Sequence, residues 1–456
     1  MNNIQNFIYK IKNKKGPIIW HQNRYYDSKE LLNKIKKWKI IIKKKKIKPS
    51  ELIAFQENYS IDSISFFLSA LIEKLIVVNL PPKQKNLIKL VNCKYFVDIK
   101  KFKILKKKIK SSQESIILNK FRKKKVSGLI IFSSGSSGKP KAILHNFSLL
   151  LNKFKKKRQG YRTLLMLTFD HIGGINTLLS CILNPEGLAI CVNKKSAVYV
   201  CKIIEKTKAT LLPTSPTFLN MLMFSGLYKI YDFSSIKLIT YGTEPMPENL
   251  LSKLHKTFPN IFFKQTYGLS EIGIMRTKDK KNGSLYVKVG GEDYKTKIIN
   301  DYLYVKSKAN MVGYINAPQP FDKDGWMNTG DKVIKEKNGF IKILGRDSDM
   351  INIGGEKTYP LEVENILLKF QNVLDARVYS NYHEILGNYM VADIILKKNY
   401  DNKKFNTSLL RNYCSKYLPK HKIPSKFIIK NFDEIVSNRF KKIRKNNQNN
   451  EKNNSN

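Results

Sequence analysis

Apolar and polar positions follow two alternating periods along the first part of the chain. Residues 28–46 and 61–72 repeat apolar side chains at helical spacing. Short apolar runs at residues 52–55 and 75–79 predict buried strands, the second of which ends at Pro81 and Pro82. This order of strands and helices predicts a βαβ unit in a mostly parallel sheet.

A second α/β unit is predicted in the middle of the chain. Its strands are expected at residues 164–169, 210–212 and 236–241, and its helices at residues 216–224 and 249–258. The alternation therefore predicts two α/β subdomains in succession.

Shorter strands begin near Gly283 and predict a small all-β piece, which includes residues 302–305 and 340–344. A compact α+β unit is expected beyond it, with a helix and two strands at residues 360–370, 373–378 and 390–395.

The predicted fold class is α/β. We expect a large N-terminal domain (residues 1–345) of two α/β subdomains plus a small β subdomain. A small mobile α+β C-terminal domain (346–445) should follow, and then a disordered Asn-rich tail (446–456).

The 456 residues carry a formal net charge of +49, and 42% of them are hydrophobic. Such a charge raises the possibility of a nucleic-acid or anionic-membrane partner. Nearly all the cations are Lys, however, and Ile and Asn are also abundant, as the codon usage of an A/T-rich genome would impose. The densest runs, Lys43–Lys46, Lys106–Lys108 and Lys155–Lys157, have no interleaved aromatic residues that would stack bases. We therefore predict solvated faces and no specific nucleic-acid partner.

The five cysteines form no CxxC pair and have no His beside them in metal-ligand spacing, which predicts a reduced, cytoplasmic chain. The first residues lack the apolar core of a signal peptide. The longest apolar stretch, residues 64–80, is interrupted by Glu73 and Lys74, so no membrane span is expected.

A loop of small residues lies between two apolar segments. It reads Ser133-Ser134-Gly135-Ser136-Ser137-Gly138-Lys139-Pro140-Lys141. Backbone N–H groups, hydroxyls, Lys139 and Lys141 can together grip phosphate oxygens. The loop is not a Walker A sequence, because Pro140 rather than Ser or Thr follows Lys139. The alternative, a flexible Ser/Gly linker, is disfavoured by the structured segments on both sides.

This loop resembles the phosphate-loop signature of the adenylate-forming superfamily, which includes acyl-CoA synthetases, nonribosomal adenylation domains and luciferases. Further motifs follow in the family's order over residues 17–445: Gln265-Thr266-Tyr267-Gly268-Leu269-Ser270-Glu271, Asn328-Thr329-Gly330-Asp331, Gly345-Arg346-Asp347-Ser348-Asp349 and Gly354-Gly355-Glu356. The resemblance implies an enzyme that converts a carboxylic acid and MgATP to acyl-AMP, and then forms a thioester with coenzyme A.

The resemblance also implies roles for single residues. Glu271, in the motif that contains Gly268 and Ser270, is expected to bind Mg²⁺, since a hard cation prefers carboxylate oxygen. Tyr267 is expected beside the adenine, and Asp331 with Arg346 at the ribose hydroxyls. The stretch Gly242-Thr243 resembles the segment that lines the purine, although ordinary loop packing explains Thr243 equally well.

Three further positions carry expected functions. His171 corresponds to a residue that lines the acyl pocket, and a binding role is expected rather than acid–base chemistry. Lys442 aligns with the family's catalytic lysine, although Lys441 replaces the usual Gly and leaves the register open by one residue. Gly354 and Gly355 should leave room for the pantetheine arm, while Ser348 marks the hinge.

Three alternatives remain. The enzyme could load the phosphopantetheine thiol of a carrier protein instead of coenzyme A. A basic nucleic-acid-binding protein would show affinity that falls steeply with salt and no ATP chemistry. A non-enzymatic relic of the fold is disfavoured by intact Glu271, Asp331 and Arg346. The acid and the oligomeric state do not follow from the sequence.

Overall fold

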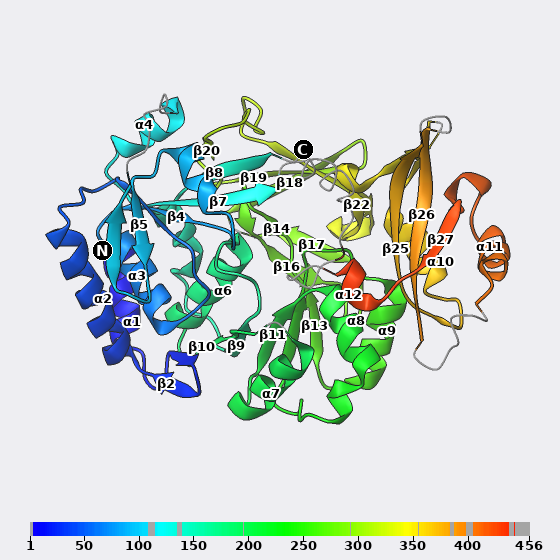
Figure 1. Ribbon diagram of the computed structural model, residues 1–456, viewed down its shortest axis with the longest axis horizontal. Coiled ribbons are helices and arrows are strands. Elements are labelled where there is room, and N and C mark those ends of the chain that lie inside the picture. The colour runs from blue at the N-terminus through cyan, green and yellow to red at the C-terminus, as the bar shows by residue number, and fades with distance from the viewer. Residues whose placement is uncertain are drawn as a thin grey trace, which may run out of the picture.

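The computed structural model describes residues 3–107, 115–134, 139–194, 196–291, 293–353, 355–383, 387–397, 405–436 and 442. Figure 1 shows two α/β units beside each other, a β-rich unit next to both, and a separate unit that carries the C-terminal strands. The predicted fold class, α/β with a small β subdomain and a C-terminal α+β unit, is confirmed. The predicted tail at residues 446–456 lies outside the described residues.

The first α/β unit is built on a seven-stranded sheet, parallel at its centre and antiparallel at both edges. Helices α2 and α3 pack against each other on this sheet, and α2 buries an apolar stripe that includes Trp38. The strand order is β20 (Gly313–Tyr314), β8 (Pro140–Asn146), β7 (Gly128–Ser134), β4 (Ile76–Asn79), β3 (Leu52–Phe55), β5 (Tyr95–Asp98), β6 (Lys103–Lys106). The helices are α1 (Asn3–Lys12), α2 (Ser28–Lys44), α3 (Ile61–Ile72), α4 (Ile116–Arg122) and α5 (Phe147–Leu150), which is followed by the 3-10 turn η2 (Asn152–Phe154).

The second α/β unit has a seven-stranded sheet that is parallel except for its last pair. The strand order is β13 (Phe262–Gln265), β12 (Leu238–Tyr241), β11 (Leu211–Thr214), β9 (Arg162–Leu165), β10 (Leu188–Cys191), β1 (Ile19–His21), β2 (Arg24–Tyr26). Its helices are α6 (Ile172–Leu183), α7 (Ala197–Thr207), α8 (Pro216–Ser225) and α9 (Glu248–Thr257). The first strand of the chain therefore completes the second sheet and joins the two units.

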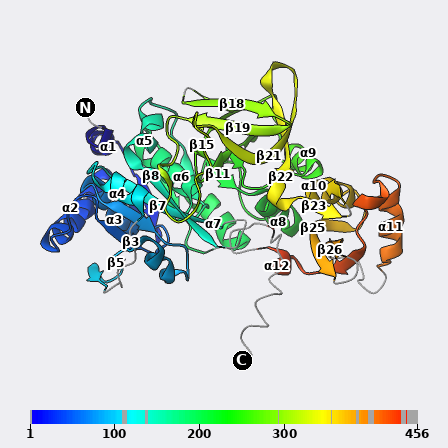
Figure 2. The same ribbon diagram turned by 90° about the horizontal axis from the view of Figure 1, so that it is seen from above.

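The β-rich unit is a six-stranded antiparallel sheet with a short hairpin beside it, and Figure 2 shows its strands above the two α/β units. The order is β16 (Arg276–Asp279), β17 (Val287–Gly290), β22 (Ile341–Arg346), β21 (Met327–Lys335), β19 (Tyr302–Ser307), β18 (Tyr294–Ile299), and the hairpin is β14 (Gly268–Leu269) with β15 (Gly273–Ile274).

The C-terminal unit has a hydrophobic core of its own, which includes Val363, Leu367, Val378 and Ile394. In Figures 1 and 2 it stands at one end of the molecule. Its elements are β23 (Ile351–Ile353), β24 (Glu356–Thr358), α10 (Pro360–Leu367), β25 (Val373–His383), β26 (Gly387–Leu396), α11 (Thr407–Ser415), β27 (Lys426–Ile429) and α12 (Phe432–Ile435).

One predicted strand is wrong at its end. The apolar run at residues 164–169 predicts a strand throughout, but β9 ends at Leu165. Phe169 instead leaves the strand and stacks on Tyr59, with ring centres 4.5 Å apart, and meets Phe67 edge-on. The apolar pattern therefore continues beyond the end of β9 because Phe169, in the loop after the strand, packs into the hydrophobic core.

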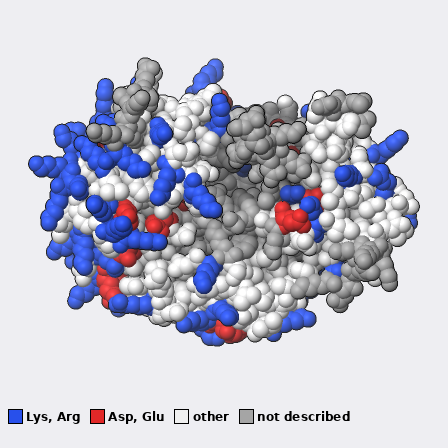
Figure 3. Space-filling model, viewed as in Figure 1, with Lys and Arg blue, Asp and Glu red and all other residues white. Residues whose placement is uncertain are grey.

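The lysine runs lie on the surface where they are described. Figure 3 shows Lys and Arg gathered over the part of the molecule formed by the first α/β unit. Lys43, Lys44 and Lys155–Lys157 are exposed, as expected for solvated faces. No helix among the described residues is both long and apolar enough to cross a membrane. All five cysteines are free thiols and buried.

Candidate active site

The predicted phosphate loop joins two paired strands. β7 and β8 run antiparallel with Ser133 opposite Lys141 and Ser134 opposite Pro140. Lys139 is exposed where the described chain resumes. A strand thus follows the loop, whereas a helix follows a Walker A loop. Four predicted loop residues lie outside the described residues: Gly135, Ser136, Ser137 and Gly138.

Tyr314 lies between Lys141, at the end of the loop, and the predicted metal ligand Glu271. Its Nζ atom lies 5.0 Å from the ring centre of Tyr314, whose hydroxyl donates to Oε1 of Glu271 at 2.7 Å. Burial, followed by the charge of Glu271, raises the pKa of Tyr314, so the phenol stays protonated and donates. The backbone carbonyl of Glu271, between β14 and β15, accepts from the N–H of Met311 at 2.7 Å. The tyrosine hydrogen bond thus orients the carboxylate, while the Met311 contact holds the backbone of the turn.

The donor set around Glu271 fits a metal that arrives with a nucleotide. Oε2 of Glu271 has no hydrogen-bond partner among the described residues. In the described part of the chain, no group of three or more His, Cys, Asp and Glu gathers that could hold a metal ion alone. Mg²⁺ is commonly bound by one or two carboxylates together with substrate phosphates, and one free carboxylate oxygen suits that arrangement.

Asp331 gathers a guanidinium and a phenol around one carboxylate. Its Oδ1 accepts from Nε of Arg346 at 2.8 Å, and its Oδ2 accepts from the hydroxyl of Tyr267. The first pair is a consequence of register, since Asp331 on β21 lies directly opposite Arg346 on β22. Asp331 is 3% exposed, so both partners are needed to stabilise its charge.

The charges around Asp331 also reach Glu271. Burial and the charge of Asp331 raise the pKa of Tyr267, which therefore acts as a hydrogen-bond donor. Desolvation lowers the pKa of Arg346, but Asp331, Tyr267 and Glu271 raise it by more. The Arg346 side chain is 46% exposed, so its guanidinium remains open to a ligand. The structure thus brings Tyr267, Glu271, Asp331 and Arg346 into one site.

The predicted adenine segment lies at the carboxyl end of the second sheet. Thr266, just after β13, donates its N–H to the carbonyl of Tyr241, the last residue of β12, at 2.7 Å. A Cβ at Gly242 would lie 2.5 Å from Oγ1 of Thr266, so only glycine fits. Thr243 has φ +72°, which is strained for a β-branched residue. Ligands of open α/β sheets bind at this edge, and strain of this kind gathers at functional sites.

A buried histidine supports the turn that carries Ser270 and Glu271. Nε2 of His145 lies 2.7 Å from the carbonyl oxygen of Ser270, and burial lowers the pKa of His145 to about 4. The neutral ring therefore donates from Nε2 to the carbonyl. A Cβ at Gly268 would lie 2.6 Å from the carbonyl oxygen of Gly273, so glycine lets the two strands of the hairpin approach.

His171 forms the beginning of α6. Its Nδ1 atom accepts from the N–H of Gly173 at 3.2 Å, so the side chain caps the helix and Nε2 carries the ring proton. The residue is half-buried. This contact orients the imidazole at the start of α6. The role of His171 in lining the acyl pocket stays a prediction.

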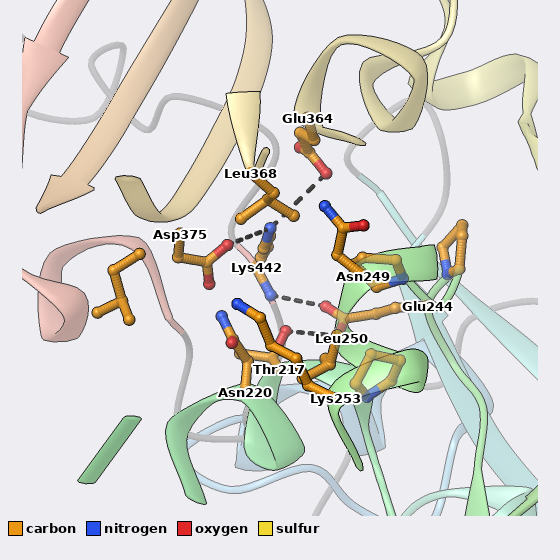
Figure 4. Close-up of a pocket in the computed structure, with 14 residues that line it drawn as sticks. Thr217, Asn220, Glu244, Asn249, Leu250, Lys253, Glu364, Leu368, Asp375 and Lys442 are labelled. Atoms are coloured by element: carbon orange, nitrogen blue, oxygen red, sulfur yellow. Dashed lines mark hydrogen bonds and ion pairs between the residues drawn. The ribbon is translucent and has the colours of Figure 1, made fainter. Parts of the chain in front are cut away.

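Lys442 lies away from this cluster, in contact with acidic residues of the C-terminal unit (Figure 4). Its Nζ atom is 2.8 Å from Oδ1 of Asp375 and 3.6 Å from Oε2 of Glu364, and it donates to the carbonyl of Ala376 at 2.6 Å. The lysine side chain is 8% exposed and each carboxylate side chain 1%. The sequence prediction placed this ammonium at the reacting groups, and its described contacts are elsewhere.

Glu244 connects Lys442 to the second α/β unit. Its Oε1 accepts from the backbone N–H of Lys442 at 2.7 Å, and its Oε2 accepts from the Thr217 hydroxyl at 2.6 Å. Figure 4 shows these contacts around an open pocket of about 530 Å³ between α8, α9 and the C-terminal unit. Glu244 follows Gly242 and Thr243 by one or two residues, so one carboxylate ties the adenine segment to Lys442.

Gly355 lies between β23 and β24 of the C-terminal unit, and Ser348 lies just before this unit. Gly355 has φ +88°, and a Cβ there would meet no atom within 4 Å. Ser348 is exposed in the 3-10 turn η5 (Asp347–Asp349), which follows Arg346. Gly354 lies outside the described residues.

Sequence reasoning missed His145, Tyr314, Glu244, Glu364 and Asp375. Their partners are remote in the chain, and no local motif marks such contacts. Glu244 alone had a signal, since it immediately follows the Gly242-Thr243 stretch.

Two family models match the chain: that of AMP-binding enzymes over residues 55–314, and that of the AMP-binding enzyme C-terminal domain over residues 362–439. Among curated relatives, the 4-coumarate–CoA ligase of Pinus taeda is 26% identical over 58% of this chain and 55% of its own length. The 2-succinylbenzoate–CoA ligase of Bacillus subtilis is 26% identical over 74% of this chain and 72% of its own length. The chain thus spans between half and three quarters of these relatives.

Solved structures show the same fold. An anthranilate CoA ligase in complex with anthranoyl-AMP has a TM-score of 0.79 at 16% identity, over 94% of this chain and 93% of its own. The o-succinylbenzoate CoA synthetase of Bacillus subtilis, in complex with its acyl-adenylate intermediate, has a TM-score of 0.75 at 20% identity, over 96% of this chain and 97% of its own. With a family model that matches more than half of its length, the chain belongs to the AMP-binding enzymes, the adenylate-forming superfamily that its motifs resemble.

Proposed function

We propose that the chain is an ATP-dependent acid–thiol ligase, which activates a carboxylic acid as acyl-AMP and transfers the acyl group to a thiol, with coenzyme A as the acceptor. One observation carries the proposal. The carboxylate of Asp331 is held by Arg346 and Tyr267, and the Arg346 guanidinium lies within electrostatic reach of Glu271. Tyr267 follows the carboxyl end of β13, at the edge of the second α/β sheet where ligands bind. The CoA ligases among the relatives support the choice of coenzyme A.

In the first step, a carboxylate oxygen of the acid attacks the α-phosphorus of ATP. An O–P bond forms, and the bond to pyrophosphate breaks. Two anions must approach each other, so the site has to supply positive charge. Lys139 and Lys141 at the phosphate loop and Arg346 beside Asp331 are the cations placed for that role. Mg²⁺, held through Glu271, would stabilise the departing pyrophosphate.

Binding is assigned to neighbouring residues. Asp331 accepts from the ribose hydroxyls, and Gly242, Thr243 and Tyr267 surround the adenine. His171, at the start of α6, lines the pocket for the acid. These contacts hold the two reactants in reach of each other, which converts a reaction between separate molecules into one within a complex.

The second step is proposed to use another pose of the C-terminal unit. We place the domain boundary at residue 345 and the hinge at Ser348, because a separate hydrophobic core begins at Ile351. Lys442 serves acyl-AMP formation, for which its ammonium must leave Asp375. Gly354 and Gly355 then make room for the pantetheine arm of coenzyme A.

Two finer assignments belong to the same proposal. The five buried free thiols fit a reducing compartment, and we assign the enzyme to the cytoplasm. Coenzyme A is preferred to a carrier protein on the names of the relatives, and a direct comparison of the two acceptors decides between them.

The test is a panel of carboxylic acids incubated with MgATP and followed by pyrophosphate release. We expect release of pyrophosphate with at least one acid as acyl-AMP forms, and then, when coenzyme A is added, formation of a thioester with release of AMP. A panel with no release, or one that releases inorganic phosphate and ADP, would refute the proposal. Thioester formation on a carrier protein but not on coenzyme A would change the acceptor.

A further inference from the structure

A second cavity lies beside the active site, between α6, η2 and the hairpin strand β15. It has an open volume of about 580 Å³ and is lined largely by apolar side chains, among them Leu150, Phe154, Ile175 and Ile274. Two of its walls begin at active-site residues. Ile172 follows His171 directly, and Gly273 lies two positions after Glu271. The cavity therefore lies next to the segments that carry His171 and Glu271.

Three charged residues line this mostly apolar space: Lys153, Lys308 and Asp293. Lys153 is the one whose contacts lie on the cavity wall itself. Nζ of Lys153 donates to Oδ1 of Asn176 at 2.6 Å and to the carbonyl of Ile274 at 2.7 Å, and all three residues line the cavity. No carboxylate among the described residues forms an ion pair with Lys153. An ammonium with two neutral acceptors retains one hydrogen to donate. The amide nitrogen of Asn176 has no partner among the described residues and is a second donor.

The surroundings of Lys153 favour the arrival of an anion. Burial, followed by the charges of Arg158 and Arg276, lowers the pKa of Lys153 to about 7, while Asp293 raises it. A cation that is desolvated beside other cations is costly, and an incoming carboxylate offsets that cost.

A purely structural role for Lys153 explains less. The hydroxyl of Tyr294 also approaches the carbonyls of Ile272 and Ile274, at 3.3 and 3.4 Å. The backbone of β15 therefore has a neutral donor without the lysine. Burying a charged lysine only to donate to an amide oxygen and a carbonyl would cost more free energy than a neutral donor would.

We propose that this cavity holds the distal part of the acid, and that Lys153 and Asn176 select acids with an apolar body and a second anionic group, such as a dicarboxylic acid. The inference rests on the proposed function and narrows its substrate class. The apolar walls take up the hydrocarbon or aromatic body, and the two donors bind the distal carboxylate.

The experiment compares matched pairs of acids of equal length, one with a terminal methyl group and one with a terminal carboxylate. Pyrophosphate release is measured for the wild type, Lys153→Met and Asn176→Leu, with Lys155→Met as the control because Lys155 is exposed two residues away. We expect the wild type to prefer the diacid. Lys153→Met should lower kcat/KM for the diacid by about tenfold or more and leave the monoacid within about twofold, since a site built to bind a polar group discriminates strongly.

Binding of the diacid without ATP, measured by calorimetry, separates this inference from the proposed function. Binding that depends on Lys153 supports the cavity even if no acid releases pyrophosphate, in which case only the proposed function falls. Pyrophosphate release that prefers monoacids overturns the inference and leaves the function standing. If Lys153→Met lowers kcat/KM equally for the diacid and the monoacid, the lysine only supports the backbone of β15. That result also overturns the inference. No binding and no release refute both.

Discussion

Nζ of Lys442 lies 2.8 Å from Oδ1 of Asp375, and both side chains are almost completely buried. Glu364 adds a second buried carboxylate at 3.6 Å. A lysine in such surroundings stabilises the C-terminal unit by compensating charge that the protein has removed from water. The same lysine is the one assigned to acyl-AMP formation, so its two roles must compete.

Substitutions on the two sides of this pair should separate those roles. We expect Lys442→Ala to slow acyl-AMP formation by a factor on the order of a hundred and to lower the free energy of unfolding by roughly 3 kcal/mol, because buried carboxylates lose their partner. Asp375→Asn should also destabilise the unit but should keep acyl-AMP formation at or above the wild-type rate. Pyrophosphate release and chemical denaturation measure the two effects.

Two other outcomes would contradict this assignment. An adenylation defect in Asp375→Asn as large as that in Lys442→Ala would mean that the lysine acts only through the stability of the C-terminal unit. An adenylation defect in Lys441→Ala with a normal Lys442→Ala would shift the register by one residue.

Glu271→Gln should abolish acyl-AMP formation and leave the fold intact, because it removes a charged metal ligand at constant volume. Tyr314→Phe is the matched control. It removes only the hydrogen bond to Oε1, so the loss of rate should be much smaller. Pyrophosphate release is measured over a range of Mg²⁺ concentrations. Near-normal turnover of Glu271→Gln at saturating Mg²⁺ would rule out the assignment.

Asp331→Ala should raise KM for ATP by about tenfold or more with a smaller effect on kcat, because ribose contacts persist from the ground state into the transition state. The substitution also leaves Arg346 and Tyr267 without their shared acceptor. Asp331→Asn keeps one acceptor oxygen, so its KM for ATP should lie between those of the wild type and Asp331→Ala. Initial rates at varied ATP test this, and an unchanged KM in Asp331→Ala would contradict it.

The sequence predicted what local patterns encode. Helix α3 and strand β3 have the predicted bounds, because each is a buried apolar segment bounded by clear breaks. The motifs predicted that Asp331 and Arg346 lie near each other at the ribose hydroxyls, and the register of β21 on β22 brings the two side chains into contact. The motif residues come from different sheets: the phosphate loop connects β7 and β8 of the first α/β unit, Gly242 follows β12 of the second, and Asp331 and Arg346 lie on β21 and β22 of the β-rich unit.

Contacts between remote segments could not be predicted in the same way. Strand β1 pairs with β10, and only three residues, Ile19–His21, carry the signal. The acidic partners of Lys442, Glu364 and Asp375, come from a helix and a strand that no motif links to it. A surface acid and a buried acid look alike in a sequence, because burial depends on packing of the whole unit.

Gly355→Trp tests whether the two half-reactions use different faces of the C-terminal unit. We expect acyl-AMP formation to remain and thioester formation from supplied acyl-AMP to be lost, since the indole would fill the path of the pantetheine arm. Gly355→Ala is the control for backbone strain. It meets the same φ of +88° and no atom within 4 Å, so it carries the strain without the bulk. Equal losses of both half-reactions in Gly355→Trp would contradict the two-pose mechanism.

The buried His145 should make the fold sensitive to acid in a defined window. Its pKa is lowered by burial from 6.5 to about 4, although its hydrogen bond to Ser270 opposes the shift. The unfolded chain therefore takes up the proton more readily than the folded one between these two pH values. By linkage, the contribution of His145 to stability is fully present above pH 6.5 and is lost progressively as the pH falls toward 4, at up to about 1.4 kcal/mol per pH unit.

His145→Gln isolates this contribution, because glutamine can still donate to the carbonyl of Ser270 but does not titrate. We expect the free energy of unfolding of the wild type to fall more steeply than that of His145→Gln between pH 6.5 and about 4, and the two curves to run parallel above pH 7. His383→Gln, at an exposed position, should follow the wild type. Since Nδ1 of His145 is buried without a partner among the described residues, a protonated ring would carry an unsatisfied donor. Parallel curves for the wild type and His145→Gln through the whole acid range would show that this histidine does not set the acid limit.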